Sequence, residues 1–163
     1  MGKDKKEKKE KTPSKTKEDA SDGGDGELRP VCAIAKPLAD IGFHKKILKV
    51  VKKASKHKQV KRGVKEVVKA LRKDVKGLCV IAGDISPIDV ITHIPILCEE
   101  MGVPYIYVHS KEELGAAGQT KRPTSCMLVL PDAQKGGDKM SADDASEFKD
   151  MYGKVVAKIK SLD

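Results

Sequence analysis

The sequence predicts an α/β fold, a three-layer α-β-α sandwich with a central four-stranded mixed sheet. Stretches with helical periodicity alternate with short apolar stretches four times, which is typical of a sheet covered by helices. Residues 78–82 (LCVIA) are apolar without interruption, as expected of a central strand buried on both faces. Aromatic residues make up only 3% of the chain and Trp is absent, so the core must be aliphatic.

The first 30 residues are predicted to form a disordered, charged tail ahead of a single domain over residues 31–163. A basic run, KDKKEKKEKTPSKTK, precedes an acidic one, EDASDGGDGE. Both lack the apolar surface needed to offset the entropy lost on ordering. Lysine runs of this kind serve as nuclear localisation signals and as loose RNA contacts, and a purely solvating tail fits equally well.

An amphipathic helix is predicted from residue 38 to about residue 56, with Pro37 in its first turn. Apolar side chains at helical spacing form its inner face: Ile47, Val50, Val51 and Ala54. Lysines form its outer face: Lys45, Lys46, Lys49, Lys52, Lys53 and Lys56. A basic amphipathic helix can also lie on a membrane or bind calmodulin. Because the apolar face has no bulky aromatic anchor apart from Phe43, a core helix beside an RNA site is favoured.

Residues 59–73 (QVKRGVKEVVKALRK) combine a short strand, a glycine and a basic helix. Apolar residues at helical spacing face inward: Val64, Val67, Val68 and Leu71. Basic residues face outward: Lys65, Lys69, Arg72 and Lys73. Before the helix, Lys61 and Arg62 precede Gly63, a residue that lets another backbone come close. A phosphate at Gly63 would meet the helix dipole, free amides and positive charge together, so nucleic-acid binding is predicted. A surface helix with a lysine-rich polar face is the open alternative.

Glu66 is the single carboxylate within this positive stretch. A carboxylate is poor for non-specific phosphate binding, but it can accept hydrogen bonds from a base amino group. Alternatively, Glu66 pairs with Lys69 on the helix surface or places a favourable charge in the first turn. Both interpretations remain open from the sequence.

A helix is predicted over residues 86–101, between the strand 78–82 and a further strand over 105–108. Its N-terminus carries a capping pattern made of Ser86, Pro87 and Asp89. Its inner face is predicted to consist of Ile88, Ile91, Ile94 or Pro95, and Cys98. Pro95 lacks a backbone N–H, so a kink or a broken start is expected near His93.

Two capped helices and one more strand complete the predicted fold. The short helix KEELGAA, residues 111–117, follows a capping pattern of Ser110 and Glu113. The strand over residues 126–130 leads through a flexible connection, residues 132–139, to a C-terminal helix over 142–160. That helix is capped by Ser141 with Asp144, and one face is apolar: Ala145, Phe148, Tyr152, Val155, Val156 and Ile159.

The loop GQTKRPTS, residues 118–125, is a second candidate RNA contact. Its charged and hydroxyl-bearing part consists of Lys121, Arg122, Pro123, Thr124 and Ser125. Lysine and arginine can neutralise phosphates, and hydroxyls can bond to phosphate or sugar oxygens. A plain surface loop is the alternative.

The basic charge is concentrated in one segment. The chain has a formal net charge of +9 and a pI of about 9.3, which favours a polyanionic partner. Residues 36–76 contain fifteen Lys or Arg against three acidic residues, a net of +12, so the remainder of the chain nets −3. This segment includes the helix that starts after Gly63.

The sequence carries no motif typical of catalysis or of a cofactor. Neither Gly-rich phosphate loop occurs, and there is no G-x-S-x-G nucleophile elbow. Asp84 lies at the carboxyl end of a strand, where an α/β enzyme would place a catalytic group. A loop hydrogen bond or a protein contact is favoured for Asp84. We therefore expect a non-enzymatic protein without cofactors.

Cysteine and histidine spacing gives no indication of a metal site. The four cysteines are far apart and form no C-x-x-C pair, and Cys79 and Cys126 lie in strand-like runs, so we expect buried, reduced thiols.

No apolar run approaches the roughly twenty residues that span a bilayer. The N-terminus has no apolar signal-peptide region. We expect an intracellular protein with no membrane partner.

Several stretches together resemble the kink-turn RNA-binding superfamily of small ribosomal and ribonucleoprotein subunits. They are RGVKEVVKALRK, GLCVIAGDISPIDVITHIPILCEE and VPYIYVHSKEELGAAGQTKRPTS with the strand after it, and the likeness covers about residues 31–131. RGVKEV and TKRPTS are most similar to the branch found in box H/ACA ribonucleoproteins. The resemblance implies a three-layer α-β-α sandwich that holds RNA at residues 61–69 and at the loop 119–125.

Carried over by position, three residues match the superfamily pattern. Gly63 matches the glycine at the RNA backbone, Glu66 the carboxylate facing guanines of the sheared G·A pairs, and Lys69 the nearby lysine. The chain departs from the pattern at Lys65, which replaces the usual Asn, and in the loop, which lacks the usual apolar run. Both changes replace base readout by charge, so we expect looser RNA specificity with added selectivity from a protein partner.

The resemblance implies a function, partners and a location. The expected function is that of a non-catalytic RNA-binding subunit supporting guide-RNA-directed pseudouridylation and rRNA processing, with snRNA modification and telomerase RNA as further targets. The expected partners are an H/ACA guide RNA, the pseudouridine synthase and the small Nop-ten-type subunit, in the nucleus and nucleolus. Exposed parts of the GDISP loop and of the helix 88–100 are the expected protein-contact surface.

Two other functions remain open. One is a kink-turn-binding ribosomal or spliceosomal protein of the same fold, which strong preference for a kink-turn over a plain hairpin would indicate. The other is a stress-type adaptor or small enzyme that binds only proteins, which complexes insensitive to nuclease would indicate.

Overall fold

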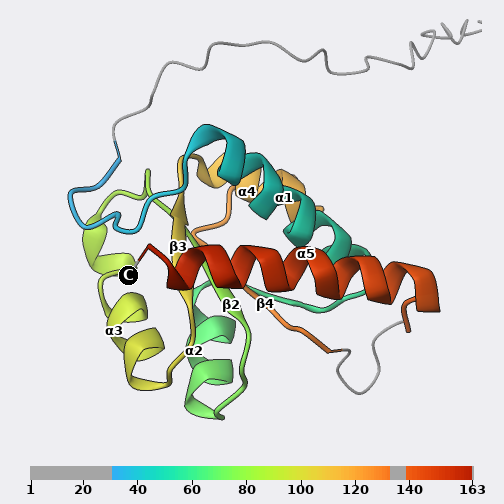
Figure 1. Ribbon diagram of the computed structural model, residues 1–163. Coiled ribbons are helices and arrows are strands. Elements are labelled where there is room, and N and C mark those ends of the chain that lie inside the picture. The colour runs from blue at the N-terminus through green and yellow to red at the C-terminus, as the bar shows by residue number, and fades with distance from the viewer. Residues whose placement is uncertain (1–30, 133–138, 163) are drawn as a thin grey trace, which may run out of the picture.

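Four strands form one mixed sheet between two layers of helices in the computed structural model, which describes residues 31–132 and 139–162 (Figure 1). The elements in chain order are α1 (Ile41–Lys56), β1 (Val60–Arg62), α2 (Val64–Arg72), β2 (Leu78–Ala82), the 3-10 turn η1 (Ile88–Val90), α3 (His93–Glu100), β3 (Tyr105–Val108), α4 (Lys111–Ala117), β4 (Cys126–Val129) and α5 (Ala142–Lys160). The predicted α-β-α sandwich with a four-stranded mixed sheet is confirmed. The predicted N-terminal tail and most of the connection 132–139 lie outside the described residues.

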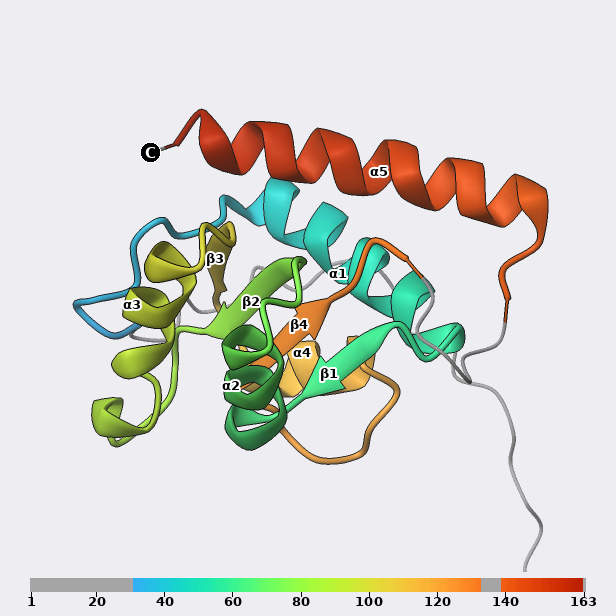
Figure 2. The ribbon, with the colours of Figure 1, turned by 90° about the horizontal axis from the view of Figure 1, so that it is seen from below.

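The strand order in the sheet is β1-β4-β2-β3 (Figure 2). β2 and β3 are parallel, whereas β4 is antiparallel to both β1 and β2. Thus the last strand in the chain lies between the first two. The shortest strand, β1, forms one edge of the sheet.

Strand β2 separates two apolar clusters because its side chains alternate between the faces of the sheet. Leu78 and Val80 point into the cluster beneath α1, α4 and α5. Cys79 and Ile81 point into the cluster beneath α2 and α3. All five β2 residues are buried, and full burial of each Leu, Val or Ile stabilises the fold by about 1.5–3 kcal/mol. This explains why β2 has an uninterrupted apolar sequence.

Helix α1 begins at Ile41, three residues later than predicted. The preceding residues instead run beside β3, where the Tyr107 N–H donates to the Pro37 carbonyl oxygen (2.9 Å) and the Ala39 N–H donates to the Tyr107 carbonyl oxygen (3.0 Å). These backbone groups are satisfied by the neighbouring strand, so the placement of Pro37 in a first helical turn was wrong.

The predicted helix over residues 86–101 is divided into two parts. One 3-10 turn, Ile88–Val90, precedes α3, which begins at His93. Pro95 occupies the third helical position, where its missing N–H leaves no hydrogen bond unmade, so the break expected near His93 is confirmed. The side chain of Ser86 does not cap a helix, and Ile88 is 38% exposed rather than inward.

Helices α4 and α5 both have the predicted serine caps. The Ser110 Oγ accepts a hydrogen bond from the Glu113 N–H (3.3 Å). The Glu113 carboxylate does not return to the cap but contacts Nε2 of His44 on α1. One half of the predicted capping box is therefore formed, and the other half is used to join α4 to α1.

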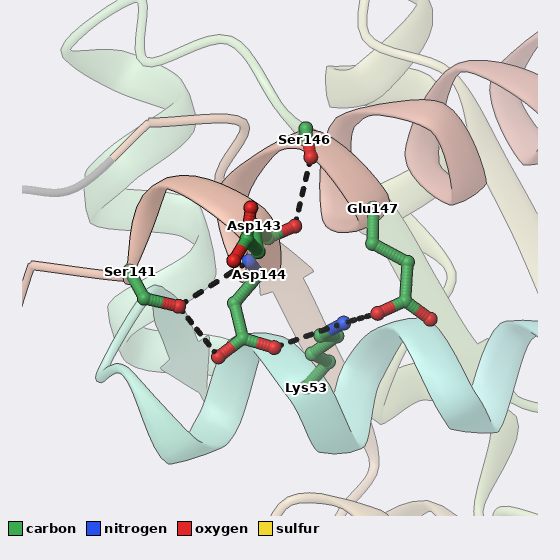
Figure 3. Close-up of polar contacts among 6 residues, drawn as sticks. All are labelled: Lys53, Ser141, Asp143, Asp144, Ser146 and Glu147. Carbon is green, nitrogen blue, oxygen red and sulfur yellow. Dashed lines mark hydrogen bonds and ion pairs between the residues drawn. The ribbon is translucent and has the colours of Figure 1, made fainter.

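The start of α5 is held to α1 by a polar cluster (Figure 3). The Ser141 Oγ accepts from the Asp144 N–H (3.3 Å) and donates to the Asp144 carboxylate (2.9 Å). The Lys53 ammonium pairs with Asp144 (3.3 Å) and with Glu147. The Ser141 hydroxyl and Lys53 lower the pKa of the Asp144 carboxyl below its ordinary value. Helix α5 therefore begins at a fixed position on α1.

The cysteines in the strands are buried free thiols, as predicted. Burial raises the pKa of Cys126 to about 12. The neighbouring Cys98 and burial raise the pKa of Cys79 well above its ordinary value. Neutral thiols of this kind are poor nucleophiles and poor metal ligands.

Close packing of the loop 118–125 against α4 depends on Gly115. A Cβ at this position would lie 2.3 Å from the backbone carbonyl oxygen of Arg122 and 3.3 Å from the Cα of Pro123. Backbone atoms cannot move aside as a side-chain tip can. Thus only glycine lets the loop pack this closely.

The Gly115→Ala substitution is expected to lower the free energy of unfolding. Relative to glycine, alanine stabilises a helix by up to ~1 kcal/mol, whereas overpacking destabilises the fold by about 1–3 kcal/mol. Because the Cβ would meet backbone atoms that cannot move aside, we expect the overpacking cost to exceed the gain in helix propensity. Gly153→Ala is the matched control, since a Cβ there meets nothing within 4 Å and should stabilise α5. Urea unfolding of both variants measures the difference, and an equal gain in stability for both would contradict it.

Candidate nucleic-acid interface

The predicted basic helix and the predicted basic loop meet at one edge of the sheet. β1 and β4 are antiparallel neighbours, with Arg62 opposite Met127. The Gly63 N–H continues the pairing by donating to the Cys126 carbonyl oxygen (3.0 Å). Because residues 118–125 lead directly into β4, this pairing places the loop beside the N-terminus of α2.

The side chain of Arg62 links the two segments directly. Its Nη1 donates a hydrogen bond to the Gly118 carbonyl oxygen (3.2 Å). A guanidinium has five N–H donors, so this contact leaves others available to a ligand. Arg62 was predicted only as a phosphate contact, whereas the structure also gives it a role in positioning the loop.

The backbone at Gly63 leaves open space for a ligand. Its φ of +83° and ψ of 157° define a conformation that is essentially restricted to glycine. A Cβ at Gly63 would meet no atom within 4 Å. As the N-cap residue of α2, it provides no side-chain cap, and the first-turn amides of a helix attract anions.

Glu66 is bound to the backbone just before α2. The Arg62 N–H donates to Oε2 of Glu66 (3.3 Å). Among residues 31–132 and 139–162, no ion pair joins Glu66 to Lys69. The surface-pair alternative is therefore not supported, and the Glu66 carboxylate can accept further hydrogen bonds through its remaining lone pairs.

The outer face of α2 is positively charged, as predicted, and it borders a hollow of about 490 Å³. The hollow is lined by Val64, Lys65, Val68, Lys69, Arg72, Lys73 and His93. The three basic residues of α2 and Lys73 directly after it are exposed, and Lys61 on β1 is half-buried. Glu66 is the one acidic residue of α2 and does not line the hollow.

The loop 118–125 is held by hydrogen bonds that do not involve its charged side chains. The Thr120 Oγ1 donates to the Arg122 carbonyl oxygen (2.7 Å) and accepts from the Arg122 N–H (3.2 Å). The Thr124 N–H donates to the Lys111 carbonyl oxygen of α4 (3.1 Å). The side chains of Lys121, Arg122 and Pro123 are exposed, while Thr124 is half-buried.

The structural roles of three residues of this region were not predicted from the sequence. Thr120 and Gly115 shape the loop, and His93 lines the hollow beside α2. A Thr two residues before Arg122 is a signal for a local side-chain turn. Nothing in the spacing of His93 indicates its place beside α2, because that depends on the packing of α3.

The other candidate chemistry finds no support in the structure. Oδ1 of Asp84 accepts a hydrogen bond from the Lys111 N–H (2.9 Å), which is the favoured loop role. In the part of the chain that the structure describes, no group of three His, Cys, Asp or Glu side chains could hold a metal ion. The described helices include none that is both long and apolar enough to cross a bilayer.

A protein-family model matches over half of the chain. Residues 45–136, from α1 past β4, match the ribosomal protein L7Ae/L30e/S12e/Gadd45 family. The matched range includes β1, α2 and the loop 118–125, and hence the whole candidate interface.

Curated relatives and a solved structure agree with this match. An H/ACA ribonucleoprotein complex subunit 2-like protein of Arabidopsis thaliana is 57% identical over 129 residues, which is 79% of this chain and 81% of the relative. The H/ACA ribonucleoprotein complex subunit nhp2 of Schizosaccharomyces pombe is 53% identical, over 68% of this chain and 69% of the relative. The structure of the Giardia lamblia 15.5kD RNA binding protein superposes with a TM-score of 0.67 at 27% identity, covering 79% of this chain and 97% of that one. The chain therefore belongs to the ribosomal protein L7Ae/L30e/S12e/Gadd45 family, within its branch of H/ACA ribonucleoprotein complex subunit 2 proteins.

Proposed function

We propose that this chain is the non-catalytic RNA-binding subunit of the box H/ACA small nucleolar ribonucleoprotein. In that role it supports guide-RNA-directed pseudouridylation and the processing of rRNA in the nucleolus, and the same site would serve snRNA-modifying particles and telomerase RNA. The observation that carries the proposal is the meeting of the open Gly63 backbone with the basic loop 118–125. The names of the relatives support the assignment to an H/ACA particle.

The proposed binding mode gives each part of the interface a separate role. Phosphates lie at the first-turn amides of α2, beside Gly63, and are neutralised by basic side chains. These are Lys61, Arg62, Lys65, Lys69, Arg72, Lys121 and Arg122. Glu66 accepts hydrogen bonds from base amino groups, and Pro123 with Thr124 contacts the RNA from the loop. Lys65 places a positive charge where the superfamily pattern has the side-chain amide of Asn, so selectivity for a kink-turn is low.

The Lys65→Ala and Lys69→Ala substitutions test this site. Each is expected to weaken binding to an H/ACA guide hairpin and to lower the salt slope of binding by about one, because one phosphate contact is lost. Lys52→Ala on α1 is the control, since it removes another exposed positive charge outside the proposed site. A salt titration by filter binding provides the slopes, and unchanged slopes for both α2 variants would refute the site.

Competition between RNAs separates this function from its nearest alternative. The second candidate is a kink-turn-binding ribosomal or spliceosomal protein of the same fold, and the match to a ribosomal protein family supports it. A labelled guide hairpin is challenged with an unlabelled kink-turn or an unlabelled plain hairpin. Similar competition by the two supports the H/ACA assignment, whereas strong preference for the kink-turn supports the second candidate.

The Gly63→Ala substitution tests whether RNA approaches this backbone. A side chain at φ +83° is strained by about 1–3 kcal/mol, and its Cβ would occupy the space proposed for RNA. Gly102→Ala is the matched control, because Gly102 has φ +65° at the end of α3 with open space around it. Both variants should unfold more easily, but only Gly63→Ala should lose hairpin affinity. Equal affinities in fluorescence anisotropy would exclude Gly63 from the interface.

We propose that the pseudouridine synthase and the small Nop-ten-type subunit assemble on the surface formed by η1 and α3. Exposed apolar side chains there support this, because clustered apolar surface marks protein contacts. They are Ile88 (38% exposed), Val90 (41%) and Ile96 (60%).

The Ile96→Asp substitution is expected to abolish co-purification with the synthase and the small subunit, because it places a charge in an apolar contact. Hairpin affinity should stay unchanged, since Ile96 does not line the hollow beside α2. The control is Ile41→Asp on α1, where Ile41 is 64% exposed. Loss of co-purification in both variants, or in neither, would argue against this surface.

A further inference from the structure

A groove of about 360 Å³ lies between α1 and α5, away from the interface described above. Its rim consists of four exposed lysines: Lys46, Lys49, Lys154 and Lys158. Its floor consists of Phe43, Val50, Met151 and Val155. No carboxylate lines the groove, and none of its residues belongs to the α2 and loop interface.

The two ends of the contact between α1 and α5 differ in how their positive charges are neutralised. The two helices are antiparallel, because Lys53 near the end of α1 meets Glu147 near the start of α5, while Phe43 meets Lys158. At the first of these ends, carboxylates of α5 neutralise Lys53 (Figure 3). At the groove, by contrast, lysines of both helices border the same space.

These four lysines are uncompensated within the described part of the chain. None of them pairs with a carboxylate among residues 31–132 and 139–162. The Lys158 ammonium lies 4.5 Å from the centroid of the Phe43 ring, and this cation–π contact keeps the charge at the groove. Like charges that share a groove repel one another, and a bound polyanion would relieve that repulsion.

The burial of the floor decides what kind of ligand fits. Phe43 is 4% exposed, Val50 1% and Val155 3%, so these three side chains of the apolar floor are covered, and only Met151 is half-buried. An amphipathic peptide helix needs an open apolar groove for its own apolar face. The charged groups that remain accessible at the groove are the ammonium ends of its four lysines, which suit a chain of phosphates bound without base readout.

We propose that this lysine-lined groove is a second RNA site, which binds the phosphate backbone of a double-stranded segment. Helices α1 and α5 cover the sheet face opposite to α2 and α3 (Figures 1 and 2). The groove therefore holds RNA other than the segment at Gly63. The proposal extends the proposed RNA-binding function and rests on it.

The experiment uses the full chain, a guide hairpin and a short RNA duplex without loops. The test variant is Lys49→Gln/Lys154→Gln, and the charge-matched control is Lys45→Gln/Lys52→Gln, which changes exposed α1 lysines outside the groove lining. Salt titrations by fluorescence anisotropy measure duplex binding. A capture assay then asks whether a chain already saturated with hairpin retains the immobilised duplex.

The wild-type chain and the control variant should capture the duplex while carrying the hairpin. The groove variant should lose this capture, and its salt slope for the duplex should fall by about two relative to the wild type, because two phosphate contacts are lost. Its hairpin affinity should change little. Equal slopes for the groove and control variants, or displacement of the duplex by the hairpin, would overturn the second site.

Two further measurements distinguish failure of this site from failure of the proposed function. If Lys65→Ala/Lys69→Ala leaves hairpin binding intact, the proposed function fails, whatever happens at the groove. If that variant loses hairpin binding but the groove variant still captures the duplex, only the second site is refuted. Titration with a peptide of residues 18–27 tests an acidic protein segment as the occupant. Peptide binding that depends on the groove, without duplex binding that does, would also overturn the proposal.

Discussion

The antiparallel pairing of β1 with β4 is the contact on which the interface depends. It is short, with Val60 opposite Val129 and Arg62 opposite Met127, yet it joins segments separated by more than fifty residues of chain. Because side chains alternate along a strand, a slip of one residue would exchange the two faces of β1 and displace Gly63 from the end of the loop. The hydrogen bonds from Gly63 to Cys126 and from Arg62 to Gly118 continue this register beyond the strands. Core packing therefore sets the register of β1 against β4, and this register sets the position of Gly63 beside the loop 118–125.

Much of the fold was predictable because local periodicity and burial agree. The apolar run of β2, the buried Val67 and Leu71 of α2 and the serine caps of α4 and α5 lie where their patterns indicated, whereas Val68, which was predicted to face inward, lines the hollow beside α2. The other errors arose where tertiary hydrogen bonds override local preference. Pro37 is suited to a first helical turn, yet its carbonyl oxygen is bonded to β3. Ile88 has the spacing of an inward residue, but Pro95 makes α3 begin too late to include it.

The candidate site could be predicted in composition but not in geometry. Lys65, Lys69 and the residues TKRPTS were recognisable from charge and turn chemistry. Their proximity depends on strand order, since β4 lies between β1 and β2 although it comes last in the chain. No local pattern specifies that order. For the same reason His93 and the lysines of the α1–α5 groove could not be assigned to shared surfaces before helix packing was known.

The hydrogen bonds that hold the loop 118–125 also affect the rate at which RNA binds. Hydrogen bonds within the chain, from Thr120, Arg62 and the backbone of α4, hold it in place. A segment that is ordered in advance loses little conformational entropy when its ligand arrives. Association should then proceed at a speed set by electrostatic attraction, without waiting for a loop to close. Differences in affinity among related RNAs would consequently be expressed as differences in residence time.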